Sequence, residues 1–235
     1  ENKPNQDIDK LYKLYKKFGF SMWLNQLGNL DLKAKDSYNN SDIVESVEAK
    51  EIISKKANII DKYSQTLVLE ISALEDMIEN LIKCRTFVFD LETTSLDYMN
   101  AAIVGWVFLI ENDSYYVPVG HDYIDAPKQL DFDKVMDVIK PILEDTKIGK
   151  IGHNLKYDSH VLANYGIRLN AIKEDTMVKS YCLNSVISRH NMDDLSEYYL
   201  NHKTIHFVDI AGKGKNQITF NQVSLEHAFP YACED

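Results

Sequence analysis

The sequence has few of the residues on which several large protein classes depend. Its three cysteines, Cys84, Cys182 and Cys233, are widely spaced and form no C-x-x-C pair. That scarcity argues against a disulfide scaffold and a cysteine-based zinc site, and it predicts three reduced thiols. Basic residues are also scarce, because 26 Lys and Arg face 36 Asp and Glu, which gives a net charge of −10. A generally basic nucleic-acid-binding surface is therefore excluded.

Long apolar runs are missing as well. The longest extends from Ala101 to Ile110, about half of the roughly 20 residues that a membrane-spanning helix needs. The charged, Asn-rich start at 1–10 cannot serve as a signal peptide. We therefore expect a soluble, cytoplasmic monomer with no membrane partner. The 235 residues, 45% of them hydrophobic, suffice for one full domain with its own core and a smaller attachment.

Composition divides the chain into three parts. Apolar residues within 1–30 recur at helical spacing around a break at Gly19, so this part is expected to be a helical piece that needs a partner surface. Residues 31–56 are polar and charged, as in a linker. The compact domain is expected at 57–235.

Within the compact domain, the order of elements is that of a mixed α/β sheet. Three strand candidates in quick succession suggest an antiparallel meander, and the alternating helices and strands that follow suggest parallel units. The second of the three is apolar throughout, which fits a strand buried on both faces. The C-terminal third is expected to be mostly helical. Strands are expected at 65–71, 86–91, 101–110, 115–119, 147–152 and up to Asp175, and helices at 72–82, 132–143 and 155–165.

Local signals predict three helix boundaries. Ser72 and Glu75 form an S-x-x-E capping box before a segment with helical apolar spacing. Asn154 is a natural N-cap for the helix that follows it. Pro230 stands in a helical segment that starts at Ser224, and because an internal proline removes a hydrogen bond, it predicts a kink or a new helix start.

Acidic side chains gather at the ends of the expected elements. Asp90 and Glu92 lie two apart at a strand end, so both point to one side of the sheet. Asp158 lies one turn into the helix after the strand 147–152, near the sheet edge where parallel-sheet proteins place their sites. Tyr231 and Asp235 are four apart and share one helix face. Taken singly, each also fits a solvated surface acid or a buried tyrosine.

Converging carboxylates suit one kind of chemistry. Divalent ions such as magnesium take oxygen ligands and are held by a few carboxylates plus substrate phosphate. Two ions about 3.5 to 4 Å apart stabilise the attacking and the leaving oxygen of an in-line displacement, as in phosphodiester hydrolysis. The sequence offers no Ser-His-Asp set, phosphate-binding glycine loop or cysteine nucleophile that would compete for this role.

Several segments resemble those of a known nuclease superfamily. FDLET at 89–93, GHNLKYD at 152–158 and YACED at 231–235 resemble the three exonuclease motifs of the DEDD superfamily, in its tyrosine branch. The segments 175–185 and 202–228 are similar to the proofreading domain of the bacterial DNA polymerase I family (family A). The resemblance covers the compact domain, so the chain looks like a fragment of a longer polymerase with its exonuclease domain truncated at the C-terminal end.

The resemblance implies a ribonuclease H-like fold, with a mixed sheet flanked by helices. It also implies 3′-5′ hydrolysis of the terminal phosphodiester of single-stranded or frayed DNA 3′ ends, with release of 5′ mononucleotides. Asp90, Glu92, Asp158 and Asp235 would hold two divalent ions, Mg²⁺ or Mn²⁺, with Zn²⁺ an option at the first site. Tyr231 would orient the attacking water. The implied partners are the DNA 3′ end or frayed primer terminus and a polymerase domain of the same parent chain, while this fragment would not incorporate nucleotides.

The same resemblance assigns five residues to the substrate. Leu96 matches the residue that wedges between the last two bases, and Phe207 matches the one that packs on the terminal base. Asn154, Tyr157 and Arg189 match positions near the end nucleotide and its phosphate. Stacking contacts accept any base and are worth about 1 to 3 kcal/mol per base, which suits a proofreader. Mismatched ends unstack at lower cost, which predicts a preference for frayed ends.

Two other hypotheses stay open. In the first, the domain is a catalytically silent scaffold between a nuclease and a polymerase domain, and the intact acidic motifs argue against it. In the second, it is a ribonuclease D-like exoribonuclease, which the tyrosine-type third motif permits, although the other segments resemble the polymerase. Residues 11–27 are also similar to the final stretch of the family's 5′ nuclease domain, which predicts that 1–30 is the helical end of such a domain.

Overall fold

The structure is a computed structural model that describes residues 8–18, 20, 23–24, 63–187 and 189–235. The helix expected near the N-terminus is present as α1 (Ile8–Lys17). The linker expected at 31–56 and the domain start expected at Ala57 lie outside the described residues. Across the described ranges, no helix combines the length and the apolar character that crossing a membrane requires.

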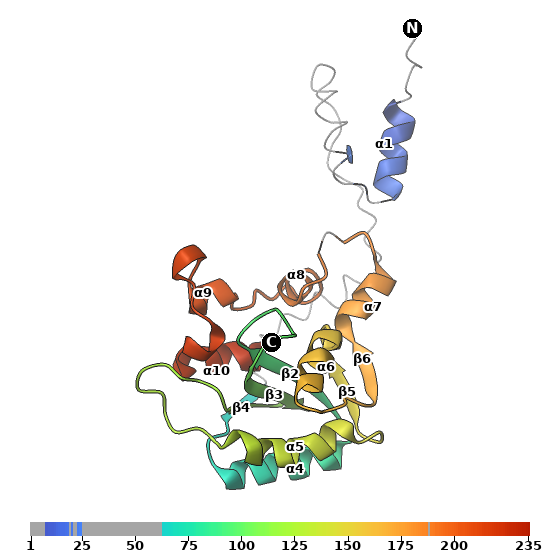
Figure 1. The fold of residues 1–235 in the computed structure, drawn as a ribbon. Coiled ribbons are helices and arrows are strands. Elements are labelled where there is room, and N and C mark those ends of the chain that lie inside the picture. The colour runs from blue at the N-terminus through green and yellow to red at the C-terminus, as the bar shows by residue number, and fades with distance from the viewer. Residues whose placement is uncertain (1–7, 19, 21–22, 25–62, 188) are drawn as a thin grey trace.

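Six strands form one mixed sheet in the order β1-β4-β3-β2-β5-β6 (Figure 1). β2, β3 and β4 pair antiparallel, whereas β5 and β6 continue the sheet parallel to β2, and β1 pairs parallel to β4. The expected meander followed by parallel units is therefore confirmed, and every residue of β3 except Leu109 is buried. The strands are β1 (Ser64–Leu67), β2 (Thr86–Thr93), β3 (Ile103–Ile110), β4 (Asp113–Pro118), β5 (Gly149–Gly152) and β6 (Ile172–Asp175).

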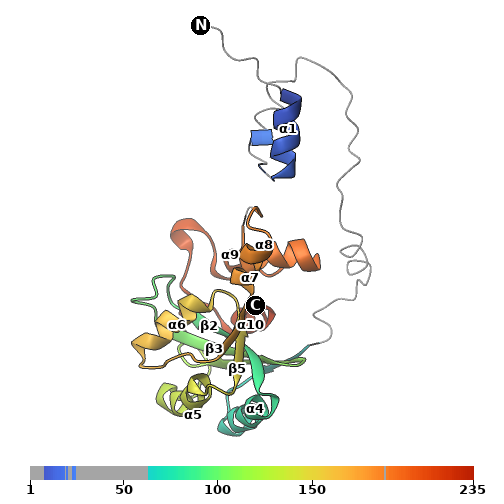
Figure 2. The ribbon, with the colours of Figure 1, turned by 90° about the vertical axis from the view of Figure 1, so that its right-hand side faces the viewer.

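Helices cover both faces of the sheet. α4 (Ile71–Cys84) and α5 (Phe132–Glu144) lie side by side beneath it, and the C-terminal helix α10 (Leu225–Glu234) packs on β1, β3 and β4 from the other face (Figures 1 and 2). The other helical segments are α6 (Leu155–Asn164), α7 (Thr176–Leu183), α8 (Met192–Leu195), the π-helical turn η2 (Ser196–Leu200), α9 (Phe207–Ala211), and the 3₁₀ turns η3 (Gly214–Asn216) and η4 (Phe220–Gln222).

The sheet separates two apolar cores. Phe87 and Phe89 of β2 belong to the larger core, which includes residues of α4, α5 and α6. Val107 of β3 belongs to the smaller core, which includes residues of α9 and α10. Asp90 pairs with Val107 across the ladder, and because strand side chains alternate, Asp90 and Glu92 both face the side of the smaller core. One strand therefore supplies apolar side chains to one face and carboxylates to the other.

Two of the expected helix boundaries are wrong at the level of local capping. The helix predicted from Ser72 begins one residue earlier, at Ile71, with Glu70 in the extended N-cap position, and no side chain caps it. Ser72 therefore lies inside the first turn, where the S-x-x-E pair cannot act as a capping box.

Asn154 occupies the N-cap position of α6, but its side chain caps nothing, because its backbone is left-handed with φ of 59°. The backbone N–H groups of Asn154 and Leu155 instead donate to the Asp175 carboxylate at 3.2 and 2.9 Å. Asp175 ends the neighbouring parallel strand β6 and also accepts the Val178 N–H at 3.1 Å, so one carboxylate caps α6 and α7. A tertiary contact has replaced the predicted local cap.

The new helix start expected at Pro230 is also wrong. α10 begins at Leu225 after Ser224 and continues through Pro230 to Glu234. The proline removes only the hydrogen bond to the Glu226 carbonyl one turn earlier. Packing of α10 against the sheet compensates for that loss, because the helix buries apolar residues on both sides of the proline.

Candidate active site

Three elements bring four carboxylates to one edge of the sheet. Asp90 and Glu92 lie in the C-terminal half of β2, Asp158 in the first turn of α6, and Asp235 at the C-terminal end of α10. Glu92 is only 8% exposed and Asp158 only 2%, while Asp90 and Asp235 are half-buried. A pair of solvated acids at a strand end is therefore excluded for Asp90 and Glu92.

The four charges act on one another. Burial raises the pKa of Asp90, and the charges of Asp158 and Asp235 raise it further. Burial also raises the pKa of Glu92, with added contributions from all three other carboxylates. Burial raises the pKa of Asp158 to about 7 and that of Asp235 to about 6. A cluster of this kind favours positive counter-charge, because like charges in a poorly solvated site disfavour ionisation.

Two carboxylate oxygens at this edge are buried without a hydrogen-bond partner, Oε1 of Glu92 and Oδ1 of Asp158. An orphaned buried acceptor carries a desolvation cost that a hard divalent cation would relieve, since such ions take oxygen ligands. The chemistry of the four carboxylates therefore fits a divalent ion. Their present positions do not complete a ligand shell, because the described part of the chain contains no three His, Cys, Asp or Glu side chains close enough to hold one ion.

Tyr231 adds a hydroxyl to the same edge. It lies on the face of α10 that also carries Asp235, and its hydroxyl donates to the Asp235 carboxylate. Burial raises the pKa of Tyr231, and the charges of Asp235 and Glu92 raise it further, so the phenol keeps its proton. The phenol is therefore a hydrogen-bond donor directed at the carboxylates.

Two aromatic residues pack on the Tyr231 ring of α10. Phe207, the first residue of α9, packs edge-to-face on the Tyr231 ring with centroids 6.3 Å apart. Phe220 stands 5.9 Å from the Tyr231 ring and is itself buried. Phe207 remains partly exposed, so one part of its surface is available to a flat ligand.

Hydrogen bonds join α6 to the end of β2 and to the loop that follows it. The Tyr157 hydroxyl of α6 donates to the Ser95 carbonyl and lies 2.6 Å from Thr93 Oγ1, which ties α6 to the end of β2. Leu96 stands next to this junction with 92% of its surface exposed. This exposure leaves the Leu96 side chain free to contact a ligand.

The remaining candidates contact groups outside the cluster. Arg189 is exposed and pairs with Asp194 of α8 at 3.9 Å, and no recorded contact joins it to the carboxylates. The backbone N–H of Asn154 donates to Asp175, as described above. Asp175 is not among the predicted site residues, although it binds the first N–H groups of α6. The signal that would have identified its capping role is an Asp directly before a predicted helix start.

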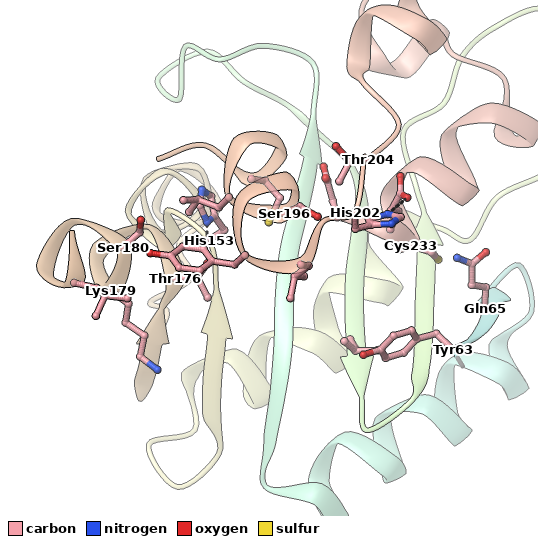
Figure 3. A pocket seen from close by; sticks show the side chains of 18 of the residues that line it. Tyr63, Gln65, His153, Thr176, Lys179, Ser180, Ser196, His202, Thr204 and Cys233 are labelled. Carbon is pink, nitrogen blue, oxygen red and sulfur yellow. Dashed lines mark hydrogen bonds and ion pairs between the residues drawn. The ribbon is translucent and has the colours of Figure 1, made fainter. Parts of the chain in front are cut away.

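A cavity of about 880 Å³ borders the cluster. Figure 3 shows His153, Thr176 and Ser180 on one side of it and His202 and Cys233 on the other. Of the four carboxylates, only Asp235 is among its lining residues, and much of the lining is apolar. The cavity is therefore next to the acidic edge and distinct from it.

A family model described as 3′-5′ exonuclease matches residues 65–235, which is most of the chain. DNA polymerase I of Pseudomonas aeruginosa is 38% identical over 242 residues, which cover 97% of this chain and 25% of that protein. The chain thus spans about a quarter of the length of this relative.

Two solved structures share the fold. The crystal structure of Trypanosoma brucei RNase D with GMP has a TM-score of 0.51 at 16% identity, over 63% of this chain and 45% of that chain. The polymerase domain of Pol1 from M. smegmatis, in complex with DNA primer-template and dNTP, has a TM-score of 0.50 at 18% identity, over 60% of this chain and 23% of that chain. At such identities the likeness concerns the fold alone, and it confirms the expected ribonuclease H-like class.

Asp90, Glu92, Asp158 and Asp235 all lie within the segment that the family model matches. The alignment with the bacterial polymerase covers nearly the whole chain. The chain therefore belongs to the 3′-5′ exonuclease family found in bacterial DNA polymerase I.

Proposed function

We propose that the chain is a divalent-metal-dependent exonuclease that hydrolyses the terminal phosphodiester of single-stranded or frayed DNA 3′ ends and releases 5′ mononucleotides. One observation carries this proposal: four carboxylates from three elements share one edge, and two of their buried oxygens have no partner. A silent scaffold would gain nothing from such a cluster, because mutual repulsion of buried acids destabilises the fold.

Asp90, Glu92, Asp158 and Asp235 would hold two ions, Mg²⁺ or Mn²⁺, with Zn²⁺ an option at the first site. Such ions stabilise charge on the attacking and leaving oxygens of a phosphodiester. The Tyr231 hydroxyl, already directed at Asp235, would orient the attacking water.

Five residues would hold the DNA end. The exposed Leu96 would wedge between the last two bases, and the open part of Phe207 would stack on the terminal base. Tyr157, Asn154 and Arg189 would lie near the end nucleotide and its phosphate. For Arg189 this requires release from Asp194, which the long 3.9 Å contact between exposed side chains makes inexpensive.

The choice of DNA over RNA rests on the polymerase relative, because the likeness to RNase D extends to the fold only. The match to the P. aeruginosa polymerase covers 97% of the chain, whereas the exonuclease family model begins at residue 65. That difference supports the proposed organisation, with the helical end of a 5′ nuclease domain at 1–30, a linker at 31–56 and the exonuclease domain at 57–235. A polymerase domain of the same parent chain would then be the partner.

The test is a Mg²⁺ or Mn²⁺ titration of this chain with a 5′-labelled single-stranded DNA, beside Asp158→Ala and a chelator control. We expect a ladder that shortens from the 3′ end and disappears in both controls. A matched RNA oligonucleotide should be cut much more slowly, and a strong preference for RNA would favour the exoribonuclease hypothesis. A folded wild-type chain that cuts neither substrate with Mg²⁺ or Mn²⁺ would favour the scaffold.

A further inference from the structure

A tyrosine phenol occupies the space beside Glu92 that a neighbouring side chain would normally fill. Glu92 pairs with Gly105 across the β2–β3 ladder, and directly paired residues project their side chains on the same face. A Cβ on Gly105 would lie 2.4 Å from the Tyr116 hydroxyl oxygen. The Tyr116 hydroxyl therefore lies where the cross-strand neighbour of Glu92 would project. Glycine at this position makes that placement possible.

The Tyr116 hydroxyl is engaged on its other side by a histidine. His121 Nε2 lies 2.7 Å from the Tyr116 oxygen, and His121 Nδ1 lies 3.0 Å from the Val223 carbonyl oxygen. A carbonyl only accepts, so Nδ1 carries the ring hydrogen. Burial lowers the pKa of His121, which favours the neutral ring. In that tautomer Nε2 is an acceptor, so the Tyr116 hydroxyl donates to it.

This direction leaves Tyr116 with no hydrogen to donate to Glu92. A tyrosine hydroxyl has one hydrogen, and here that hydrogen points to His121. The Glu92 charge contributes, after burial, to the raised pKa of Tyr116, which places the two groups within electrostatic range. Glu92 Oε1 is nevertheless buried without a hydrogen-bond partner. The Tyr116 hydroxyl thus lies near a carboxylate oxygen that accepts no hydrogen bond, and its own hydrogen is committed to His121.

The histidine is itself held in place. The Gln129 side chain accepts a hydrogen bond from the backbone N–H of His121 at 2.8 Å and donates one to the backbone carbonyl of His121 at 2.7 Å. His121 is 5% exposed, and its other partner, Val223, directly precedes the N-cap residue Ser224 of α10. The orientation of the ring is therefore set by contacts that do not involve the carboxylates.

We propose that His121 is a positioning residue that holds the hydroxyl hydrogen of Tyr116 away from Glu92 and so keeps this carboxylate free to ligate a divalent cation. The inference rests on the proposed function for the identity of the ligand. It goes further in assigning a role to two residues outside the acidic cluster. Without His121, the Tyr116 hydroxyl would turn to Glu92, and a cation would have to displace that hydrogen bond.

The experiment compares four variants of the full chain: His121→Phe, Tyr116→Phe, the double variant, and His190→Phe. His190 is a matched control, since it is similarly buried and its Nδ1 contacts Ser180. Mn²⁺ binding is measured by calorimetry without DNA, and the half-activating Mn²⁺ concentration is measured in the cleavage assay. Near-ultraviolet circular dichroism checks the fold of each variant.

His121→Phe should weaken Mn²⁺ binding about tenfold, the effect of one charge-assisted hydrogen bond that must first be broken. Tyr116→Phe alone and His190→Phe should leave binding unchanged. The double variant should restore wild-type affinity, because no hydroxyl remains to compete. A purely structural role predicts the opposite order, with the double variant at least as weak as His121→Phe.

Unchanged affinity in His121→Phe, or no recovery in the double variant, would overturn the inference while leaving the exonuclease proposal intact. A wild-type chain that binds no Mn²⁺ would overturn the proposed metal site itself. If His121→Phe does not fold, a long-range ¹H–¹⁵N spectrum of the wild-type histidine rings gives the answer directly. A protonated Nδ1 with a bare Nε2 on His121 supports the inference, and a protonated Nε2 refutes it.

Discussion

The two faces of the central sheet bury side chains for opposite purposes. On one face, Phe87 and Phe89 of β2 belong to the apolar core that α4, α5 and α6 complete. On the other, Asp90 and Glu92 of the same strand meet two further carboxylates, and burial makes their ionised forms less favourable. Burial by itself therefore does not indicate stability. What matters is whether a buried group finds the partner that its chemistry requires.

The apolar face also contains a charge, and it is handled differently. Lys150 of β5 is fully buried next to Phe87, and its ammonium group donates to the Asp145 carbonyl at 2.8 Å. One buried cation with a partner is a structural feature. Four neighbouring carboxylates, two of them with an orphaned buried oxygen, favour an external ligand instead.

The largest expected effect lies on the acidic face. Asp90→Asn keeps the shape of the side chain and removes its charge, so cleavage should fall at least about a thousandfold, because metal stabilisation of transition-state charge is worth several kcal/mol. In chelator at pH 8 the variant should melt at a higher temperature than the wild type, since repulsion is relieved. Single-turnover cleavage and calorimetric melting measure the two effects. A lower melting temperature would contradict the contrast between the faces.

On the apolar face, removal of a side chain should lower stability instead of raising it. Phe89→Ala removes a fully buried ring and should cost about 3 to 5 kcal/mol of unfolding free energy, measured by urea denaturation. Ile124→Ala is the matched control, because this side chain is 90% exposed and its truncation should change stability by less than about 0.5 kcal/mol. Equal losses for the two variants would show that Phe89 is not part of a cooperative core.

The junction between the faces should show an intermediate effect. α6 packs on the apolar side but carries Asp158, and the Asp175 carboxylate holds its first N–H groups. Asp175→Ala should therefore lower the unfolding free energy by about 1 to 2 kcal/mol and slow cleavage as well. Asn154→Gly should change stability by less than about 0.5 kcal/mol, since glycine accepts the left-handed backbone and no side-chain cap is lost. A larger loss of unfolding free energy in Asn154→Gly than in Asp175→Ala would show that Asn154 caps α6.

The last expected effect, confined to alkaline pH, is a pH dependence from Lys150. Burial lowers its pKa from 10.5 to about 8 in the folded chain. Between these values the unfolded chain binds more protons than the folded one, so unfolding free energy rises with pH across this window. Lys150→Met should lack that rise, and the difference between the two urea midpoints, followed from neutral to alkaline pH, measures it. Parallel midpoints would place the ammonium in contact with water.

Much of this fold could be predicted from the sequence because its signals are local and periodic. Alternation in β2 put Asp90 and Glu92 on one side, and the apolar run of β3 indicated burial on both faces. Both follow from the geometry of an extended chain, and the structure agrees. The roles of the individual site residues stay predictions, although the four carboxylates do lie within electrostatic range.

Three predictions from local signals failed, two of them because a distant part of the chain decides the local structure. Ser72 and Asn154 have the chemistry of caps, yet an earlier helix start displaced one and the Asp175 carboxylate displaced the other. Pro230 has the chemistry of a helix start, yet packing of α10 on the sheet carries the helix through it. For Asn154 and Pro230, long-range contacts outweighed a local preference of about 1 to 3 kcal/mol.

The sequence by itself determined the strand alternation, the acidic motifs and the family, because these depend on residue type and spacing along the chain. Only the tertiary structure decided which groups meet across the sheet. It placed the Tyr116 hydroxyl in the space above Gly105 and turned its hydrogen toward His121, three residues whose spacing carries no signal of contact. The physical reason is that a hydrogen bond requires both partners within about 3 Å, and folding alone brings β3, β4 and the following loop to that distance.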